Sequence, residues 1–316
     1  PSSKGSARSV PGICEGRVVI VTGAARGLGR AHALEFAGQG ARVVVNDVGV
    51  ELDGSGGSTG PAGEVVEAIR AGGGEAIANG ADVADFDQAA GLIEAAIAEF
   101  GRLDVVVNNA GIVRDRMFAN ATEEEWDAVM RVHVKGHFAV SRHAVAHWRE
   151  RSKAGEEVEA RIINTSSGAG LQGSVAQSCY SAAKAAIAGL TLVQAAELGR
   201  YGITANAIAP SARTRMTEEV FAEMMAKPDD GFDAMAPENV SPLVVWLGST
   251  ESSDVTGRVF ELAGGKISVA DGWRPGPDVD KGQRWDPAEL GDVVAGLIGR
   301  AEPPVKVYGT FTNTTP

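Results

Sequence analysis

A glycine-rich turn near the start of the chain constrains the fold more than any other feature. Residues 17–22, RVVIVT, form a β-branched apolar run that predicts a buried strand. Gly23, Gly27 and Gly29 follow at once, and residues 30–39 predict a helix. Glycines at a strand-to-helix turn let the backbone approach a pyrophosphate, whose charge is favoured at the helix N-terminus.

The same alternation of strand and helix continues along the chain. Apolar runs predict strands at 17–22, 41–46, 75–81, 103–107, 161–165, 203–208 and 258–262. Helical patterns occupy 30–39, 64–71, 86–100, 126–149, 177–199 and 237–248. A capping box at Thr122–Glu125 precedes the helix at 126–149. Seven strands alternating with helices imply an α/β fold, a single doubly wound Rossmann-type domain with a seven-stranded parallel sheet and helices on both faces.

Composition supports a large α/β unit and excludes some partners. The 316 residues are 44% hydrophobic and include 41 glycines, which suits helices packed closely on a sheet. A formal net charge of -12 argues against nucleic acid or an anionic membrane surface as a partner. No apolar run reaches the length of a membrane span, and the N-terminal residues lack an apolar signal core. Cys14 and Cys179 lack metal-ligand spacing and suggest reduced thiols, so we expect a soluble, cytoplasmic protein.

An acidic residue at the end of the second strand indicates which dinucleotide is preferred. Asp47 lies 24 residues beyond Gly23, where a carboxylate accepts both ribose hydroxyls and repels a 2′-phosphate, which favours NAD over NADP. Asp82 is a candidate partner for the adenine amine, and it competes with Asp85 for the role of helix cap. We interpret Asn108 as structural. The expected cofactor contacts are Gly23, Arg26, Gly27, Leu28, Gly29, Asp47, Asp82, Val83, Asn109, Ala110, Gly111, Tyr180, Lys184, Pro210 and Thr214.

The stretch at 161–190 is the candidate site of chemistry. Tyr180 and Lys184 are four residues apart in a predicted helix and therefore share a face, and Ser167 follows the preceding strand. A phenol has a pKa of about 10, and lowering it by about three units requires about 4 kcal/mol. An ammonium about 4 Å away supplies about that much at an effective dielectric near 20. Tyr180 is thus the predicted acid/base, with Ser167 binding the reacting oxygen.

Histidines and a Met-rich segment offer further candidates. His133/His137 and His143/His147 have a spacing seen in zinc sites, but no third ligand is evident and we expect no metal. The segment at 211–237 contains Met216, Met224 and Met225 after a strand end, and either covers an apolar substrate as a lid or packs on the body.

The domain organisation follows from these assignments. We expect a flexible segment at 1–15, one NAD-binding catalytic domain at 16–265 that includes the lid, and a C-terminal extension at 266–316 packed on that domain. The Gly/Ser-rich residues 49–63 form a predicted loop without chemistry.

In their order along the chain, the glycine turn, Asn108-Asn109-Ala110-Gly111, Ser167 and Tyr180-x-x-x-Lys184 resemble the short-chain dehydrogenase/reductase family. The resemblance implies hydride transfer between a nicotinamide and a carbonyl or alcohol. It makes Tyr180 the acid/base, Ser167 the substrate orienter and Lys184 the holder of the nicotinamide ribose, and it puts Thr214 near the carboxamide. The family's helix asparagine, which supports a proton relay, is replaced here by His133. His133 is therefore a candidate catalytic residue that takes over the relay, and the alternative is a relay through backbone and water.

Further motifs, including residues 111–116 (GIVRDR), 131–138 (RVHVKGHF) and 209–216 (APSARTRM), resemble the dehydrogenase domains of peroxisomal multifunctional enzymes of type 2, also described as 17β-hydroxysteroid dehydrogenase type 4. That resemblance implies an NAD-dependent oxidation of (3R)-hydroxyacyl-CoA thioesters or of a steroid 17β-hydroxyl. It also implies a homodimer or homotetramer formed through the helices that carry His133 and Tyr180. The alternatives are a 3-oxoacyl-(acyl-carrier-protein) reductase, which normally favours NADPH, and a non-catalytic dinucleotide-sensing Rossmann protein.

Overall fold

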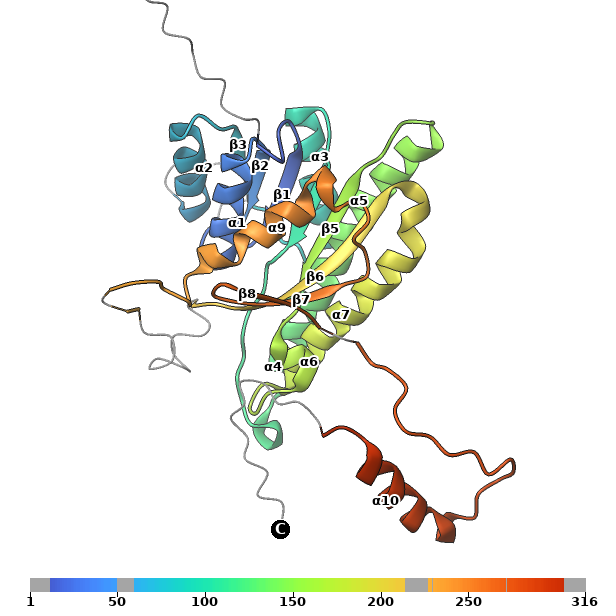
Figure 1. Ribbon diagram of the computed structural model, residues 1–316. Coiled ribbons are helices and arrows are strands. Elements are labelled where there is room, and N and C mark those ends of the chain that lie inside the picture. The colour runs from blue at the N-terminus through green and yellow to red at the C-terminus, as the bar shows by residue number, and fades with distance from the viewer. Residues whose placement is uncertain (1–11, 50–59, 214–226, 229, 271, 304–316) are drawn as a thin grey trace, which may run out of the picture.

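Eight strands form one sheet at the centre of the protein, in the order β3-β2-β1-β4-β5-β6-β7-β8 (Figure 1). The computed structural model describes residues 12–49, 60–213, 227–228, 230–270 and 272–303. The strands are β1 (Val18–Thr22), β2 (Arg42–Asn46), β3 (Ala76–Asn79), β4 (Val105–Asn108), β5 (Ala160–Thr165), β6 (Ile203–Ser211), β7 (Val259–Ala263) and β8 (Lys266–Ala270). The order reverses between β1 and β4, and in doubly wound sheets ligands bind at the carboxyl ends of the strands beside such a switch point.

The predicted α/β class is confirmed, but the prediction of seven parallel strands is wrong in one detail. Strands β1 to β7 pair in parallel, whereas β8 pairs antiparallel with β7. A two-residue loop, Gly264 and Gly265, joins them, and Gly264 has a φ of +56°. Glycine pairs are typical of tight hairpin turns. The sequence interpretation assigned residues 266–270 to the tail and so missed this edge strand.

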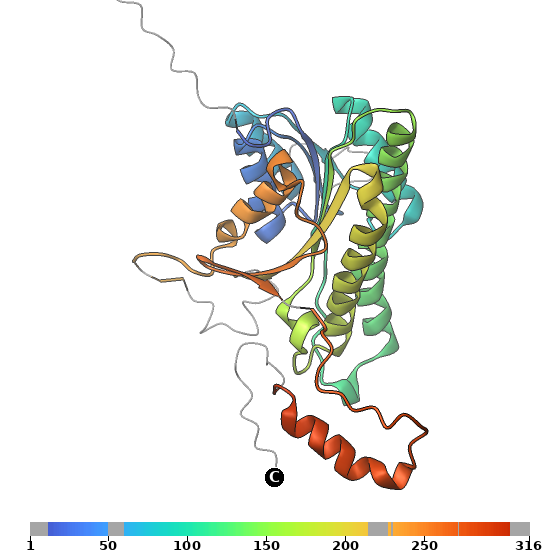
Figure 2. The ribbon, with the colours of Figure 1, turned by 45° about the vertical axis from the view of Figure 1, so that its right-hand side comes forward.

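Helices cover both faces of the sheet (Figure 2). One layer contains α1 (Gly27–Gly38), α2 (Pro61–Ala71) and α9 (Ser241–Gly248), and the other contains α3 (Phe86–Phe100), α5 (Gly136–Lys153) and α7 (Ser178–Leu198). Shorter helices are α4 (Glu123–Met130) and α6 (Gly168–Gln172). Each layer has its own apolar core against the sheet: Phe36 and Leu247 are fully buried in the first, and Trp148 in the second. Burial of both faces explains why β1, β2 and β4 read as continuous valine-rich runs.

The long helix predicted at 126–149 is interrupted by a π-helical turn. The predicted capping box is present, because Thr122 accepts a hydrogen bond from the Glu125 backbone while the Glu125 side chain accepts one from Thr122. Helix α4 then passes into the π-turn Arg131–Lys135 and continues as α5. Such turns concentrate at functional sites, and this one carries His133.

The last described helix, near the C-terminus, lies away from the sheet. Helix α10 (Leu290–Arg300) buries none of its residues, and both views place it apart from the body (Figures 1 and 2). We expected residues 266–316 to pack on the domain as an extension. Residues 266–270 are instead part of the sheet, and α10 lies apart from the domain.

Two sets of predictions concern residues outside the described ranges. Thr214 and the lid methionines Met216, Met224 and Met225 fall there, as does most of the Gly/Ser-rich loop at 49–63. None of the helices in the described ranges is both long enough and apolar enough to cross a bilayer.

Candidate active site

The turn between β1 and α1 lies at the switch point of the sheet, and its glycines leave the backbone there without side chains. Gly23 has a φ of +62°, and a Cβ added to Gly29 would lie 2.2 Å from the Gly23 carbonyl oxygen, so both positions require glycine. No side chain caps the start of α1, where Arg26 is exposed and extended. Leu28 packs against the apolar core and holds the helix in place. The N-terminal amides of α1 are therefore suited to a pyrophosphate.

Asp47 lies beside this turn. One carboxylate oxygen accepts a hydrogen bond from the Ala25 amide at 3.3 Å, and the other accepts one from Gly49 at 3.0 Å. These bonds orient a half-buried carboxylate at the end of β2. The turn and the carboxylate together fit the pyrophosphate and the adenosine ribose of a dinucleotide.

Asp82 has partners within the protein, and Asp85 rather than Asp82 caps helix α3. Its carboxylate pairs with Arg131 and accepts a hydrogen bond from Ala84. Asp85 is the N-cap of α3, because its side chain accepts hydrogen bonds from the amides of the first turn. Val83 is buried and packs against α5 at Gly136, where an added Cβ would lie 2.9 Å from a Val83 methyl group.

The segment after β4 joins neighbouring strands. The Asn109 amide donates to the carbonyls of Thr22 at 3.0 Å and Gly23 at 3.1 Å, and the Ala110 N–H donates to the Thr22 hydroxyl. The Asn108 amide donates to Ser141 and to Asn164 at 2.9 Å each, a fully buried bridge between β4, β5 and α5. The first set of bonds holds the segment after β4 against the β1–α1 turn, and the second joins β4, β5 and α5 beneath it.

Lys184 lies buried under Tyr180 on the inner face of α7. Its ammonium donates a 2.7 Å hydrogen bond to the Thr165 carbonyl at the end of β5 and lies 5.4 Å from the centre of the Tyr180 ring. Burial lowers the pKa of Lys184 from 10.5 to about 7. The helical spacing thus does bring phenol and amine together, as predicted.

Ser167 stands at the exit of β5, next to the same turn of α7. It caps the short helix α6, and its hydroxyl accepts a hydrogen bond from Ala169 at 3.2 Å. Helix α6 packs closely on α7, since a Cβ added to Gly170 would lie 2.6 Å from Lys184 backbone. The Ser166 hydroxyl also donates to the Lys184 carbonyl at 2.8 Å. These contacts hold the Ser167 strand end against the helix that carries Tyr180.

His133 packs beside Tyr180 from the π-turn. The two rings meet edge to face, with centroids 5.4 Å apart. His133 Nε2 lies 2.7 Å from the carbonyl oxygen of Ile112, directly after Gly111. Burial, together with the smaller effect of the nearby Lys184 charge, lowers the pKa of His133 from 6.5 to about 3. His133 is therefore neutral and links the segment after β4 to the tyrosine.

Two residues that the sequence did not single out hold the loop before Tyr180. The Gln177 amide donates to both carboxylate oxygens of Asp115, at 3.1 and 3.2 Å, and burial raises the pKa of Asp115. The Arg116 N–H donates to the Ala176 carbonyl at 2.6 Å, and Ala176 has a φ of +62°. Gln177 is the N-cap residue of α7, three residues before Tyr180. Nothing in the local pattern indicates this pairing, because the partners are 62 residues apart.

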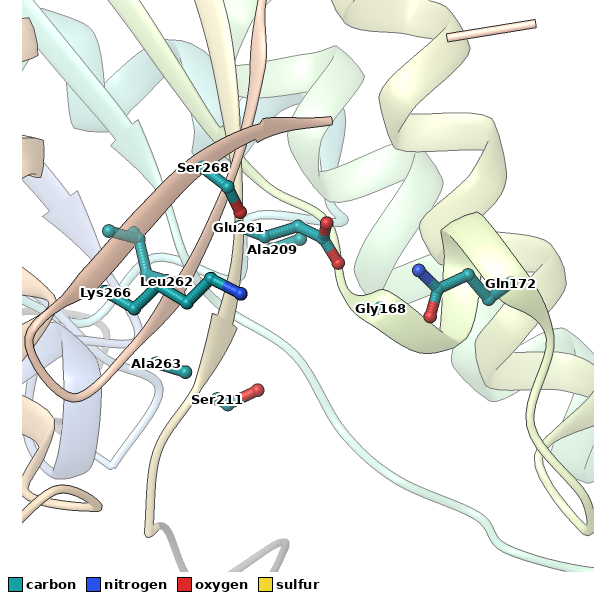
Figure 3. A pocket seen from close by; sticks show the side chains of 9 residues that line it. All are labelled: Gly168, Gln172, Ala209, Ser211, Glu261, Leu262, Ala263, Lys266 and Ser268. Atoms are coloured by element: carbon teal, nitrogen blue, oxygen red, sulfur yellow. The ribbon is translucent and has the colours of Figure 1, made fainter. Parts of the chain in front are cut away.

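A cavity of about 160 Å³ is lined in part by Gly168, the residue that follows Ser167 in the chain (Figure 3). Its walls are α6 on one side and the ends of β6, β7 and β8 on the other. Pro210 lies in β6 between two residues of that wall, and Arg213 beyond it forms an ion pair with Asp233. The cavity thus adjoins the predicted reacting centre.

The first histidine pair, His133 and His137, contacts backbone groups of Ile112 and Thr165. Within the ranges that the structure describes, no three His, Cys, Asp or Glu side chains are grouped as a metal ion would require.

Comparison with known proteins agrees with this arrangement. Residues 17–225 match the short chain dehydrogenase family. Hydroxyacyl-CoA dehydrogenase ChsB1 of Mycobacterium tuberculosis (strain ATCC 25618 / H37Rv) is 44% identical over 286 residues, 87% of this chain and 86% of that protein. Peroxisomal multifunctional enzyme type 2 of Mus musculus is 45% identical over 253 residues, 80% of this chain but 32% of that protein.

A crystal structure of a short chain dehydrogenase from Mycobacterium avium superposes with a TM-score of 0.86. It is 67% identical and covers 94% of this chain and 100% of that one. The resemblances read from the motifs, to the family and to hydroxyacyl-CoA dehydrogenase domains, are confirmed. The glycine turn, the buried Lys184 under Tyr180 and these matches lead to one conclusion: the chain belongs to the short-chain dehydrogenase family of oxidoreductases.

Proposed function

We propose that this protein is an NAD-dependent dehydrogenase that oxidises a secondary alcohol of a lipid substrate, either a (3R)-hydroxyacyl-CoA thioester or a 17β-hydroxysteroid. The observation that carries the proposal is Lys184, buried under the Tyr180 ring at the carboxyl end of β5. The names of two relatives, a hydroxyacyl-CoA dehydrogenase and a peroxisomal multifunctional enzyme, support the thioester as the first choice.

Four residues of this chain have distinct roles in the proposed reaction. Ser167 donates a hydrogen bond to the substrate oxygen, and the Tyr180 phenolate removes the hydroxyl proton. Lys184 stabilises the phenolate, because an opposite charge nearby favours the ionised forms of both groups. Asp47 holds the ribose and disfavours a 2′-phosphate. Bound NAD supplies the acceptor for the hydride.

The direct test is the formation of NADH from a panel of (3R)-hydroxyacyl-CoA thioesters and steroid alcohols. Tyr180→Phe removes the proton acceptor and should lower kcat by a factor of about 100 to 10,000. Tyr201→Phe is the matched control, because Tyr201 stacks on surface arginines away from the site. Turnover of Tyr180→Phe at the parental rate would refute the assignment.

The choice of cofactor has its own test. Asp47→Ser removes the charge that repels a 2′-phosphate, so the preference for NAD over NADP in kcat/KM should fall at least about tenfold, which corresponds to about 1.4 kcal/mol. A parent enzyme that prefers NADPH and reduces 3-oxoacyl thioesters instead would favour the carrier-protein reductase. The non-catalytic sensor is disfavoured, because such a protein has no use for the Ser167, Tyr180 and Lys184 set.

An oligomer formed through α5 and α7 belongs to the same proposal. Phe138 on α5, with Leu192 and Val193 on α7, exposes about half of its side-chain surface. Exposed apolar side chains on adjacent helices suit a subunit interface. Light scattering should give the mass of a dimer or tetramer, and Leu192→Glu should shift it toward the monomer.

A further inference from the structure

The cavity at Gly168 has a floor of three strands whose residues share one face. The pairing register places Ala209 opposite Glu261 and Ser211 opposite Ala263, and across the hairpin it places Glu261 opposite Ser268. Successive residues of a strand point to opposite faces, so these side chains all face the cavity. Phe260, which precedes Glu261 in β7, points to the other face and belongs to the apolar core.

Long polar side chains line this space. Glu261 and Lys266 rise from the floor, and Gln172 reaches in from the end of α6 (Figure 3). Within the described residues none of the three makes a hydrogen bond or ion pair. The cavity therefore presents one carboxylate acceptor, one ammonium donor and one amide, all available to a ligand.

This lining is wrong for the apolar part of a substrate. A sterol nucleus or an acyl chain needs a pocket walled by large apolar and aromatic side chains. Here the remaining wall is formed by small residues, with Leu262 as the one large apolar member among the described residues. A polar chain that alternates N–H donors and carbonyl acceptors complements the set better.

We propose that this cavity binds the pantetheine arm of a thioester substrate. Glu261 accepts a hydrogen bond from an amide N–H of the arm, Lys266 donates to an amide carbonyl, and Gln172 does either. The position of the cavity fits this role, because Gly168 in its wall directly follows Ser167, which binds the reacting oxygen in the proposed function. In a 3-hydroxyacyl thioester, the reacting carbon is separated from the thioester carbonyl by one carbon, so the arm begins close to the reacting centre. This inference rests on the proposed function.

The test uses one (3R)-hydroxyacyl group on different thiols. An ethyl thioester has no amide, a pantetheine thioester carries the arm alone, and CoA and acyl carrier protein present the same arm from two sources. Lys266→Met and Glu261→Met remove the polar groups at similar side-chain length. Lys153→Met and Glu99→Met are matched controls on exposed surfaces of α5 and α3.

Loss of a hydrogen bond to a charged group should raise KM for the pantetheine and CoA thioesters about tenfold or more, with kcat unchanged. The ethyl thioester should show no change in kcat/KM. Inhibition by free pantetheine should weaken by the same factor. Comparing the parent enzyme on CoA and carrier-protein thioesters then identifies which source it uses.

Two failures are distinguishable. If the parent enzyme oxidises thioesters but the variants affect ethyl and pantetheine thioesters equally, or neither, the assignment of this cavity is overturned. If the parent enzyme oxidises steroid alcohols and no thioester, the proposed thioester substrate itself fails, and the inference with it.

Discussion

The Lys184 ammonium lies 5.4 Å from the centre of the Tyr180 ring, and its hydrogen bond to Thr165 is buried. From the sequence we expected the Lys184 ammonium to lower the pKa of the phenol. In the structure, loss of water lowers the pKa of Lys184 to about 7, so near neutral pH its charge depends on its surroundings. A phenolate that forms beside it favours the charged lysine, which couples the two protonation states.

Lys184 should make the stability of the protein depend on pH in the alkaline range. Between about pH 7 and 10.5 the unfolded lysine binds the proton more tightly than the folded one. The free energy of unfolding should therefore rise with pH across this window by up to about 1.4 kcal/mol per unit, relative to Lys184→Met. Below pH 7 the difference should be constant. Urea titrations at pH 7 and pH 9 measure this. The surface variant Lys153→Met should show the same pH dependence of the unfolding free energy as the parent. The same pH dependence in Lys184→Met would contradict the argument that burial lowers the pKa of Lys184.

His133 should act as a neutral positioning residue. His133→Ala removes a buried ring that contacts Tyr180 and Ile112, so it should lower the free energy of unfolding by about 2 to 4 kcal/mol and also lower kcat. His133→Asn keeps a polar group for Ile112 and should recover part of the activity. Because the pKa of His133 is about 3, the pH profile of kcat/KM between pH 5 and 8 should be the same for parent and His133→Asn. An inflection that disappears in this variant would show that His133 titrates.

The Asp115–Gln177 pair should behave as one unit in catalysis. Asp115→Ala and Gln177→Ala each remove the same two contacts before Tyr180, so each should lower kcat/KM by a similar factor. The double variant should be little worse than either, with a coupling energy of about 1 kcal/mol. Arg114→Ala is the control, because the exposed Arg114 side chain bonds only to its neighbour's carbonyl among the described residues. Additive losses would show that the two side chains act independently.

His32 should make the protein less stable in acid. It is fully buried in α1, lies 2.9 Å from the Ser241 hydroxyl of α9, and burial lowers its pKa to about 3. Between pH 6.5 and 3 the unfolded state binds the extra proton, so stability should fall as pH falls through this window. His32→Gln should reduce the slope by up to about 1.4 kcal/mol per pH unit. Chemical unfolding at pH 4.5, 5.5 and 6.5 measures how the free energy of unfolding depends on pH in both proteins. Equal slopes for the parent and His32→Gln would show that folding does not lower the pKa of His32.

Much of the site was predictable because it depends on spacing within single elements. The glycines after β1, the carboxylate of Asp47 at the end of β2 and the four-residue spacing of Tyr180 and Lys184 all follow from the periods of strand and helix. Because parallel strands end at the same edge of a sheet, the sequence also determined that these groups meet.

Only the tertiary structure decided what depends on contacts distant in sequence. The π-turn that brings His133 to Tyr180, the Asp115–Gln177 pair and the polar floor of the cavity each join elements that no local pattern relates. The lowered pKa of Lys184 belongs with them, because it arises from the exclusion of water by α6, α7 and the sheet together. Local spacing specifies which groups share an edge, whereas packing specifies their charge, partners and exposure.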